Sequence, residues 1–186
     1  MKTSNAHLDI RVQRTNRLLF TTLHNLLQRH AFREIMVRQI CAEANISRAA
    51  FYLHFYDKYD LLKHYLADVR RDIASERYAF GGTEGKMIRF IHENAKGIAG
   101  VMKDADGEVL ALVRDFIHAL LLDGNGADGT PGVSHDVTDH FIVSGVMGHI
   151  AWLIDEKFAP ETDCATASLY RMIRSLLRRQ YRSNAV

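Results

Sequence analysis

Apolar residues recur three and four positions apart along nearly the whole chain, and no sustained alternation of apolar and polar residues occurs. The first spacing is that of one face of an α-helix, whereas the second would indicate strands. The pattern therefore predicts an all-α protein. Its first helix is expected from about Leu8 to Arg29, with a buried side made of Ile10, Leu18, Leu19, Leu23, Leu26 and Leu27.

Two short helices are predicted after the first one. The segment from Val37 to Ala44 is expected to turn Ile40, Cys41 and Ala44 inward. Asn45 follows it and tolerates the left-handed conformation that ends many helices. Ser47 then offers a hydroxyl that can accept from the free amides of a new helix. Three helices within about fifty residues, with a tight turn between the second and third, are typical of a helix-turn-helix unit.

The remainder of the chain predicts a bundle of longer helices. Asp57 is expected to cap the first of them, and the glycine-rich segment 123–132 is expected to be a loop. The expected helices run from about Lys58 to Tyr78, Thr83 to Lys103, Gly107 to Leu122, Ser134 to Phe158 and Asp163 to Arg182.

Charge divides the chain into two parts. The formal net charge is +2, but residues 1–66 hold ten lysines and arginines against five acidic residues. Residues 67–186 hold fourteen basic residues against seventeen acidic ones. A basic first third is typical of a nucleic-acid-binding domain joined to a different body.

Other features of the composition narrow the class of protein. No apolar run approaches the ~18 residues of a membrane span, and the N-terminal segment lacks the apolar centre of a signal peptide. We therefore expect a cytoplasmic protein without membrane contact. Cys41 and Cys164 are too few for a disulfide framework and lack metal-binding spacing, so both are expected to be reduced thiols in packed helices.

One stretch combines aromatic and cationic residues. Residues 51–59 contain five aromatic side chains, among the basic residues Arg48, His54 and Lys58. Phe51 and Phe55 share one helix face and can anchor a short helix, while Arg48 and Tyr52 lie one turn apart on another. A helix that reads the major groove needs such an exposed face, with neighbouring groups on the phosphates. The beginning of a helix at Lys58 also suits an anion.

The run IMVRQICAEANISRAAFYLHFYDKYDLLKHYL, within residues 13–66, resembles the DNA-binding head of TetR-type transcriptional regulators. The resemblance implies a three-helix head at residues 1–57 and a helical regulatory and dimerisation domain at residues 58–186. It also implies no enzyme activity and no cofactor or metal. The partners would be double-stranded DNA, a second copy of the chain and a small-molecule effector.

The same resemblance assigns DNA-binding roles position by position. It implies base or groove contacts from Arg38, Arg48, Ala49 and Tyr52, phosphate contacts from His54, Lys58, Arg14 and Thr15, and a place for Ser47 at the start of the reading helix. Two positions depart from the family pattern. Met36 stands where a hydroxyl residue usually caps the second helix, and Ala50 stands where Thr is common. Operator affinity is then expected to rest more on Arg38, Arg48 and Lys58.

The last two predicted helices resemble those of a short branch of the family that includes regulators of dihydroxyacetone kinase genes. Small residues spaced along the first of these helices, with Ala151 among them, allow a second helix to approach closely. Paired with their symmetry mates, the two helices would make a four-helix dimer interface. The expected interface residues are Ser144, Gly145, Gly148, Trp152, Leu169, Met172, Ile173 and Leu176.

Two alternatives stay open at this stage. The short branch leaves room for a co-regulator that acts through a protein partner. A helical metal-dependent enzyme could use the histidines and aspartates around residues 115–149, although His135 and Asp139 do not form a compact ligand motif with the others. The glycine-rich loop lacks the Gly and Glu that a calcium loop requires. The residues of an effector pocket are not separable from core residues by periodicity, because both have the same pattern.

Overall fold

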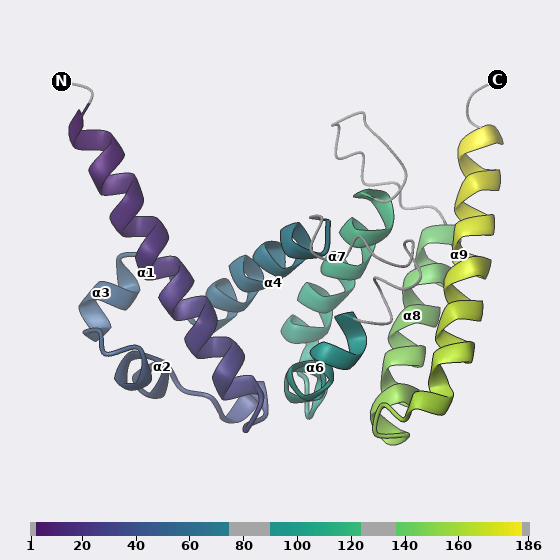
Figure 1. The fold of residues 1–186 in the computed structure, drawn as a ribbon, viewed down its shortest axis with the longest axis horizontal. Coiled ribbons are helices and arrows are strands. Elements are labelled where there is room, and N and C mark those ends of the chain that lie inside the picture. Colours follow the sequence, from purple (N-terminus) through teal and green to yellow (C-terminus); the bar gives the residue numbers. More distant parts are fainter. Residues whose placement is uncertain (1–2, 75–89, 124–136, 184–186) are drawn as a thin grey trace. The chain divides into compact units, whose positions relative to one another are not determined.

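A computed structural model describes residues 3–74, 90–123 and 137–183, and Figure 1 shows their arrangement along the chain. The described residues form helices and loops, and no strand occurs among them. The all-α prediction is therefore confirmed. Within the described part of the chain, no helix is both long and apolar enough to cross a membrane.

The backbone divides into two compact units. The first contains residues up to Val69 together with Lys96–Val113, and the second contains Arg70–Ala95 and Arg114–Val186. The first unit therefore combines the head with the first turns of α4, all but the first residue of α6 and the beginning of α7. The predicted division between a DNA-binding domain that ends at Asp57 and a regulatory domain after it concerns function, and it stays a prediction.

The head begins with α1 (Thr3–Leu27), a 3₁₀ turn η1 (Phe32–Glu34), α2 (Val37–Glu43) and α3 (Arg48–Tyr52). One side of α1 supplies the largest share of the core, and α2 packs against both α1 and α3. Asn45 has φ 51°, which confirms the left-handed turn between α2 and α3. The fully or almost fully buried side chains of the head include Leu19, Leu23, Leu26, Leu27, Phe32, Ile35, Ile40, Phe51, Leu61 and Leu62.

Three further helices follow the head in sequence: α4 (Lys58–Ala74), α6 (Ala95–Met102) and α7 (Gly107–Asp123). The polypeptide of α6 lies very close to the end of α1, because a Cβ atom built on Gly100 would be 2.3 Å from the Leu27 carbonyl oxygen. A side chain larger than hydrogen does not fit there. Gly100 therefore permits a helix contact that the sequence pattern alone did not indicate.

The second unit contains the antiparallel pair α8 (Val137–Asp155) and α9 (Asp163–Ser183), which lie side by side in Figure 1. Ile142 and Ile173 are buried between them, and Val146 and Leu169 pack against this pair. The connection contains Lys157 and Phe158 at φ 53° and 55°, followed by the 3₁₀ turn η3 (Pro160–Thr162).

Several sequence predictions need correction. Leu18 was expected on the buried side of the first helix, but it is 43% exposed because it lies about 100° around the helix from the buried Leu19. Residues 83–89 of the helix expected from Thr83 to Lys103 lie outside the described residues. The described part is interrupted at Asn94, whose side-chain amide donates to the Phe90 carbonyl oxygen. The two 3₁₀ turns were also missed, since three residues are too few to produce a periodic pattern.

Candidate nucleic-acid interface

The short helix α3 is fixed at both of its ends. Ser47 is the N-cap, and its hydroxyl oxygen accepts from the Ala50 amide at 3.0 Å, as predicted. Phe51 is completely buried, and Phe55 is 3% exposed with its ring 6.0 Å from both the Phe51 and Phe20 rings. The prediction that the two phenylalanines anchor this helix on α1 is confirmed. A helix of one and a half turns needs such anchors because it is not stable alone.

The opposite face of α3 is open. Arg48 and Ala49 are exposed, and the Tyr52 side chain is 49% exposed. The Arg48 guanidinium carbon lies 6.0 Å from the centre of the Tyr52 ring. A cation over an aromatic ring at this distance is favourable, so the two predicted groove residues support one another's position. The structure thus brings Arg48 and Tyr52 together on one exposed surface.

Arg38 and Arg14 are exposed on α2 and α1. Met36 is the N-cap of α2 and makes no side-chain cap bond, as its residue type predicts. Thr15 donates its hydroxyl hydrogen to the Arg11 carbonyl oxygen at 3.1 Å within α1. The phosphate role of Thr15 stays a prediction, and donating to a phosphate would require its hydroxyl to turn away from that carbonyl.

His54 lies directly after α3 and is partly buried. Its Nδ1 atom is 3.0 Å from the Asn16 side-chain oxygen on α1. This bond joins the end of the reading helix to the first helix of the head. Asn16 was not singled out from sequence, because an asparagine within a helix carries no pattern that indicates its partner 38 residues away.

Lys58 has a different environment from the one expected. Its ammonium lies 3.1 Å from the Phe32 and Arg33 carbonyl oxygens and 3.0 Å from that of Ile35, and it donates to all three. An ammonium has three hydrogens, so all of its donor capacity is used inside the chain. Its phosphate role stays a prediction, and in this structure Lys58 joins the beginning of α4 to the η1 turn.

Burial lowers the pKa of Lys58, while the nearby carboxylates of Asp106 and Asp57 act in the opposite direction. The ammonium also lies 4.8 Å from the centre of the Phe32 ring and 5.5 Å from that of Tyr59. Both aromatic faces favour the charged form. Lys58 is therefore a partly buried ammonium, and carbonyl oxygens and aromatic rings stabilise its charged form.

Tyr59 connects the same region to α7. Its hydroxyl donates to the Asp106 carboxylate at 2.7 Å, and this bond raises the pKa of Tyr59 to about 12. Asp106 also accepts from the Val109 amide at 3.0 Å and so caps α7. Hydrogen bonds from Val109 and Tyr59 lower the pKa of the Asp106 carboxyl. One carboxylate thus fixes both the start of α7 and a side chain next to Lys58.

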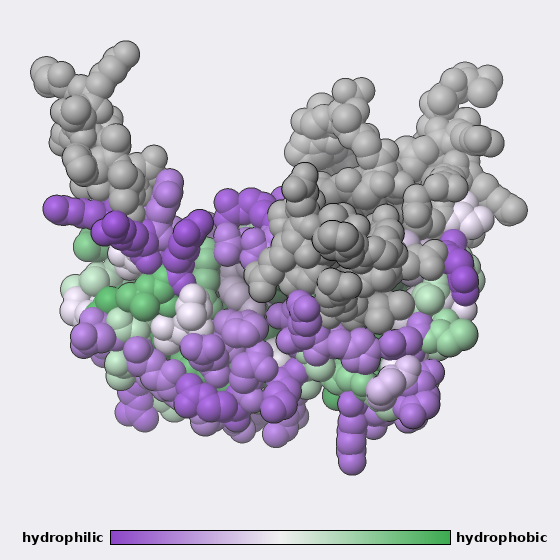
Figure 2. Space-filling view, viewed as in Figure 1, coloured by the Kyte–Doolittle hydropathy of each residue, from purple (hydrophilic) through white to green (hydrophobic). Residues whose placement is uncertain are grey.

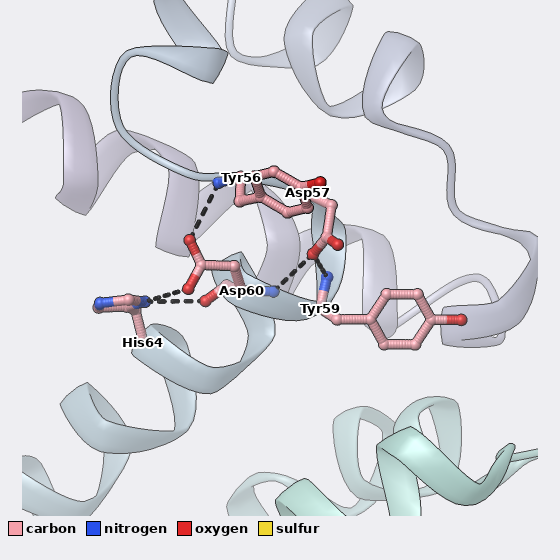
Figure 3. Close-up of polar contacts among 5 residues, drawn as sticks. All are labelled: Tyr56, Asp57, Tyr59, Asp60 and His64. Atoms are coloured by element: carbon pink, nitrogen blue, oxygen red, sulfur yellow. Dashed lines mark hydrogen bonds and ion pairs between the residues drawn. The ribbon is translucent and has the colours of Figure 1, made fainter.

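The start of α4 is fixed by two aspartates, as Figure 3 shows. Asp57 accepts from the amides of Tyr59 and Asp60 at 2.8 Å each, which confirms its predicted role as the cap. Asp60 accepts from the Tyr56 amide at 3.0 Å and lies 3.3 Å from His64. The loop between α3 and α4 is therefore held from both sides.

Sequence reasoning assigned no role to two exposed apolar side chains beside this surface. Leu53 is 85% exposed and Tyr56 is 84% exposed. Figure 2 shows hydrophobic residues gathered at the head around α1 and α3, within a mostly hydrophilic described surface. Both follow the exposed Tyr52 at the end of α3, so we add them to the candidate residues of this interface. The sequence signal that could have indicated them is their position between the end of α3 and the start of α4.

The small residues predicted for a dimer interface are exposed on α8. Ser144, Gly145 and Gly148 face open space, and no heavy atom lies within 4 Å of a Cβ built on either glycine. Trp152 is 39% exposed and Met172 is 50% exposed, whereas Ile173 is buried between α8 and α9. Leu169 is partly buried against the same pair, and the side chain of Leu176 lies outside the described residues.

Two histidines of the second unit have local partners. His149 lies 2.9 Å from the Thr166 hydroxyl, and burial lowers its pKa. His92 lies 2.5 Å from the Asp163 carboxylate. Within the described ranges, no group of three or more metal-ligating side chains is close enough to hold an ion. His135 and Asp136 lie outside these ranges. Of the two cysteines, both free thiols, Cys41 is buried as predicted and Cys164 is exposed.

Comparison with known proteins places this head in a family. Residues 20–65 match the family model described as bacterial regulatory proteins, tetR family. This match includes the last third of α1, both helices of the helix-turn-helix and the beginning of α4. No curated protein matches the chain.

Two solved structures share the fold. The TetR transcriptional regulator from Streptococcus agalactiae 2603V is 20% identical, with a TM-score of 0.53, over 81% of this chain and 88% of that one. A tetR-family transcriptional regulator from Streptomyces coelicolor is 18% identical, with a TM-score of 0.56, over 89% of this chain and 81% of that one.

A third solved structure is the dihydroxyacetone kinase operon activator DhaS. It is 19% identical over 89% of this chain and 95% of that one, with a TM-score of 0.47. This likeness is too low to assign a branch, so the predicted branch stays a prediction. Residues 20–65 thus match the tetR family of bacterial regulatory proteins, and two solved regulators of that name share the fold of the chain.

Proposed function

We propose that the protein is a ligand-responsive repressor that binds a palindromic operator as a homodimer. The observation that carries this proposal is the exposed face of α3, where Arg48, Ala49 and Tyr52 project from a helix anchored by Phe51. Arg48 can donate two hydrogen bonds to a guanine edge, and the Tyr52 ring can contact a thymine methyl group. Ala49 is small enough to allow close approach of the helix to the bases.

The α8 surface supports the homodimer. Phe141 is 67% exposed, and Trp152 is also exposed, on the same helix as the open Gly145 and Gly148. Large apolar side chains beside exposed glycines allow a second helix to pack closely against α8. A two-fold dimer would present two α3 helices about one DNA turn, ~34 Å, apart, which is what a palindromic operator requires.

Two contacts of the first unit support coupling between an effector and the head. Gly100 on α6 lies against the end of α1, and Asp106 at the start of α7 holds Tyr59 on α4. A ligand that displaces α6 or α7 would shift α1 and α4, which carry and flank the reading helix. Such a ligand lowers operator affinity only if it binds the displaced state more tightly than the DNA-competent state.

Selection of duplexes from a random-sequence pool by the full-length protein tests the DNA-binding part. The selected duplex should be palindromic. Arg48→Ala should bind it more weakly and should lose about 1–3 kcal/mol of the preference at one base pair of each half-site. Arg114→Ala is the matched control because Arg114 is exposed far from α3 in sequence. Failure to enrich any sequence, at low or moderate salt, would contradict the proposal.

Light scattering during size-exclusion chromatography tests the homodimer. The wild-type chain should elute as a dimer at micromolar concentration. Gly148→Arg should be monomeric, because it puts a long charged side chain where the proposed partner helix approaches. Its helical circular dichroism should be unchanged, since the glycine faces open space. A monomeric wild-type protein would rule out this interface.

The regulatory part is tested in cells with a reporter gene placed behind the selected duplex. Expression of the wild-type protein should lower reporter output, and Arg48→Ala should not. Increased output with the wild-type protein would show an activator and contradict the repressor part of the proposal while leaving DNA binding intact.

A further inference from the structure

The exposed face of α3 has an apolar centre. Phe51 is completely buried, so the side of the helix opposite to it points away from the head. At about 100° of rotation per residue, Ala49 and Leu53 each lie about 160° around the helix axis from Phe51. Tyr52 lies about 100° and Arg48 about 60° from Phe51 on the same scale. Ala49 and Leu53 therefore point most directly outward, and the polar pair lies to one side of them.

Leu53 continues the geometry of the reading helix. Its backbone has the helical angles φ −75° and ψ −19°, and its amide donates to the Ala49 carbonyl oxygen at 3.2 Å. Residues four apart in such a helix are surface neighbours, with Cβ atoms about 5–6 Å from one another. Leu53 is 85% exposed, and Ala49 is also exposed. Together they form one outward apolar stripe, the Ala49–Leu53 stripe.

The surroundings of the Ala49–Leu53 stripe favour DNA as its partner. Arg48 and Tyr52 lie beside it on the same helix, and residues 1–66 carry ten basic residues against five acidic ones. A basic surface attracts the phosphates of a duplex. When phosphates hold a helix in the major groove, its outward line faces the base edges. The only methyl group among these edges belongs to thymine.

We propose that Leu53 is a specificity-determining residue, which selects a thymine in each operator half-site through contact with its C5-methyl group. The inference rests on the proposed function, because it requires α3 in the major groove of an operator. A leucine side chain has no hydrogen-bonding atom, so it selects a base by burying apolar area. Opposite the same side chain, the amino group of cytosine would lose water without gaining a partner.

A protein partner is the other class of molecule that an exposed leucine suits. Stable protein interfaces bury about 800 Å² on each partner, and one leucine beside one alanine covers only a small part of such an area. A single methyl group on a base edge, in contrast, matches the size of this stripe. The size and the position of the stripe therefore both favour a base contact.

Deoxyuridine is the probe for this contact, because it lacks the C5-methyl group and keeps the hydrogen-bonding atoms that thymine presents in the groove. Burial of one methyl-sized group contributes about fourfold to an association constant. Replacing the contacted thymine in both half-sites should therefore weaken binding about fifteenfold.

The test measures the affinity of the full-length protein for the duplex selected from the random pool, with each symmetry-related pair of thymines replaced in turn by deoxyuridine. Wild type should lose affinity by about this factor at one pair. Leu53→Ala should bind the thymine duplex more weakly and should no longer distinguish the two bases at that pair. Leu53→Met keeps an apolar side chain of similar reach and should retain the distinction.

Two further variants separate base reading from other effects. Leu110→Ala is the matched control, because it makes the same substitution at a leucine of α7 that is 39% exposed. It should keep both the affinity and the distinction between the two bases. Tyr52→Ala should bind more weakly but keep the distinction at the Leu53 pair. The helical circular dichroism of Leu53→Ala should equal that of wild type, because the side chain is exposed.

Equal affinity of wild type for the thymine duplex and every deoxyuridine duplex, within about twofold, would overturn the inference and leave DNA binding intact. A selected half-site without any thymine would overturn it in the same way. Retention of the full distinction in Leu53→Ala, or its loss in Tyr52→Ala, would show that another residue contacts the methyl group. Absence of sequence-specific binding would instead contradict the proposed function itself, and the inference with it.

Discussion

The ammonium of Lys58 donates to the Ile35 carbonyl oxygen at 3.0 Å and joins residues 23 positions apart in the chain. Together with its bonds to the Phe32 and Arg33 oxygens, this contact closes the end of the η1 turn. The Phe32 oxygen also accepts from the Ile35 amide within the turn, and Lys58 adds a donor to it and to the two carbonyls that follow. The first residue of α4 thereby fixes the path of the chain that leads into α2.

Replacing Lys58 by Met should destabilise the head, because it keeps the apolar stem and removes the donor from three carbonyls. Leaving partly buried acceptors without partners costs about 1–3 kcal/mol in the free energy of unfolding. Urea denaturation measures this change. Lys63→Met, which removes an exposed ammonium from the same helix, is the control and should change stability by less than about 0.5 kcal/mol.

The same variant separates the two roles of Lys58. If the ammonium also contacts a phosphate in the complex, the dependence of log affinity on log salt becomes shallower by about one unit. If it acts only on the carbonyls, affinity falls but the salt dependence is unchanged. Equal stability of Lys58→Met and wild type would contradict the structural role.

Replacing Gly100 by Ala should weaken the packing of α6 on α1. The new methyl group would lie 2.3 Å from the Leu27 carbonyl oxygen and 3.1 Å from that of His30, and backbone atoms cannot rotate away as side chains do. Overpacking of this kind costs about 1–3 kcal/mol, against a gain of about 0.5–1 kcal/mol in helix propensity.

Thermal unfolding is the measurement for this variant. Gly107→Ala is the control, because no heavy atom lies within 4 Å of the Cβ position of Gly107. Gly100→Ala should melt below wild type and Gly107→Ala should not. If both variants melt at or above the wild-type temperature, then α6 does not lie against Leu27 as described.

The sequence was sufficient to predict the features of the head that depend on local chemistry. Ser47 and Asp57 cap helices because a short polar side chain before a helix accepts from the free amides of its first turn. Asn45 lies at the turn because few other residues tolerate its positive φ. The identity of the buried phenylalanines followed from their spacing. Each of these predictions needs only a few consecutive residues.

Contacts between distant residues could not be predicted in this way. Nothing in the sequence pairs Lys58 with three carbonyls, Tyr59 with Asp106 or Asn16 with His54, because periodicity gives the face of a residue and not its partner. An exposed lysine and a lysine that bonds to main-chain oxygens have the same pattern. The candidate DNA contacts stay predictions, and the present partners of Lys58, Thr15 and His54 could be found only from coordinates.

Removing the carboxylate of Asp106 should lower the pKa of Tyr59 from about 12 toward the ordinary value of 10.0. In the folded protein the bond to the carboxylate favours the neutral phenol, so its contribution to stability is complete below about pH 10 and is lost as pH rises toward 12. In Asp106→Ala this loss should be smaller, because burial and the carboxylates of Glu108 and Asp57 still raise the pKa of Tyr59.

Tyrosine-selective isotope labelling with NMR titration follows the Tyr59 ring among the seven tyrosines. Tyr59→Phe identifies its signal. Asp106→Asn is the informative second variant, because an amide oxygen can still accept from the phenol while the charge is gone. Its Tyr59 pKa should lie between those of wild type and Asp106→Ala, and a value equal to that of wild type would show that Asp106 is not the partner.

His24 should make the folded protein less stable in mild acid. Its Nδ1 atom lies 2.9 Å from the Tyr65 hydroxyl, between α1 and α4, and burial lowers its pKa below the ordinary value of 6.5. As pH falls below about 6.5, the unfolded chain takes up a proton before the folded chain does. The stability that His24 contributes is thus complete above this pH and is lost as pH falls toward the folded-state pKa.

Urea denaturation at about pH 7.5, 6.5 and 5.5 measures this loss, with stability falling toward the acid end. His24→Gln keeps a polar contact for the Tyr65 hydroxyl but does not titrate, so the loss should be smaller in this variant. It should not vanish, because burial lowers the pKa of His149 in the same direction. His64→Gln, at an exposed histidine, should reproduce the wild-type dependence, and a wild-type protein equally stable at all three pH values would show that neither histidine is held in the neutral form.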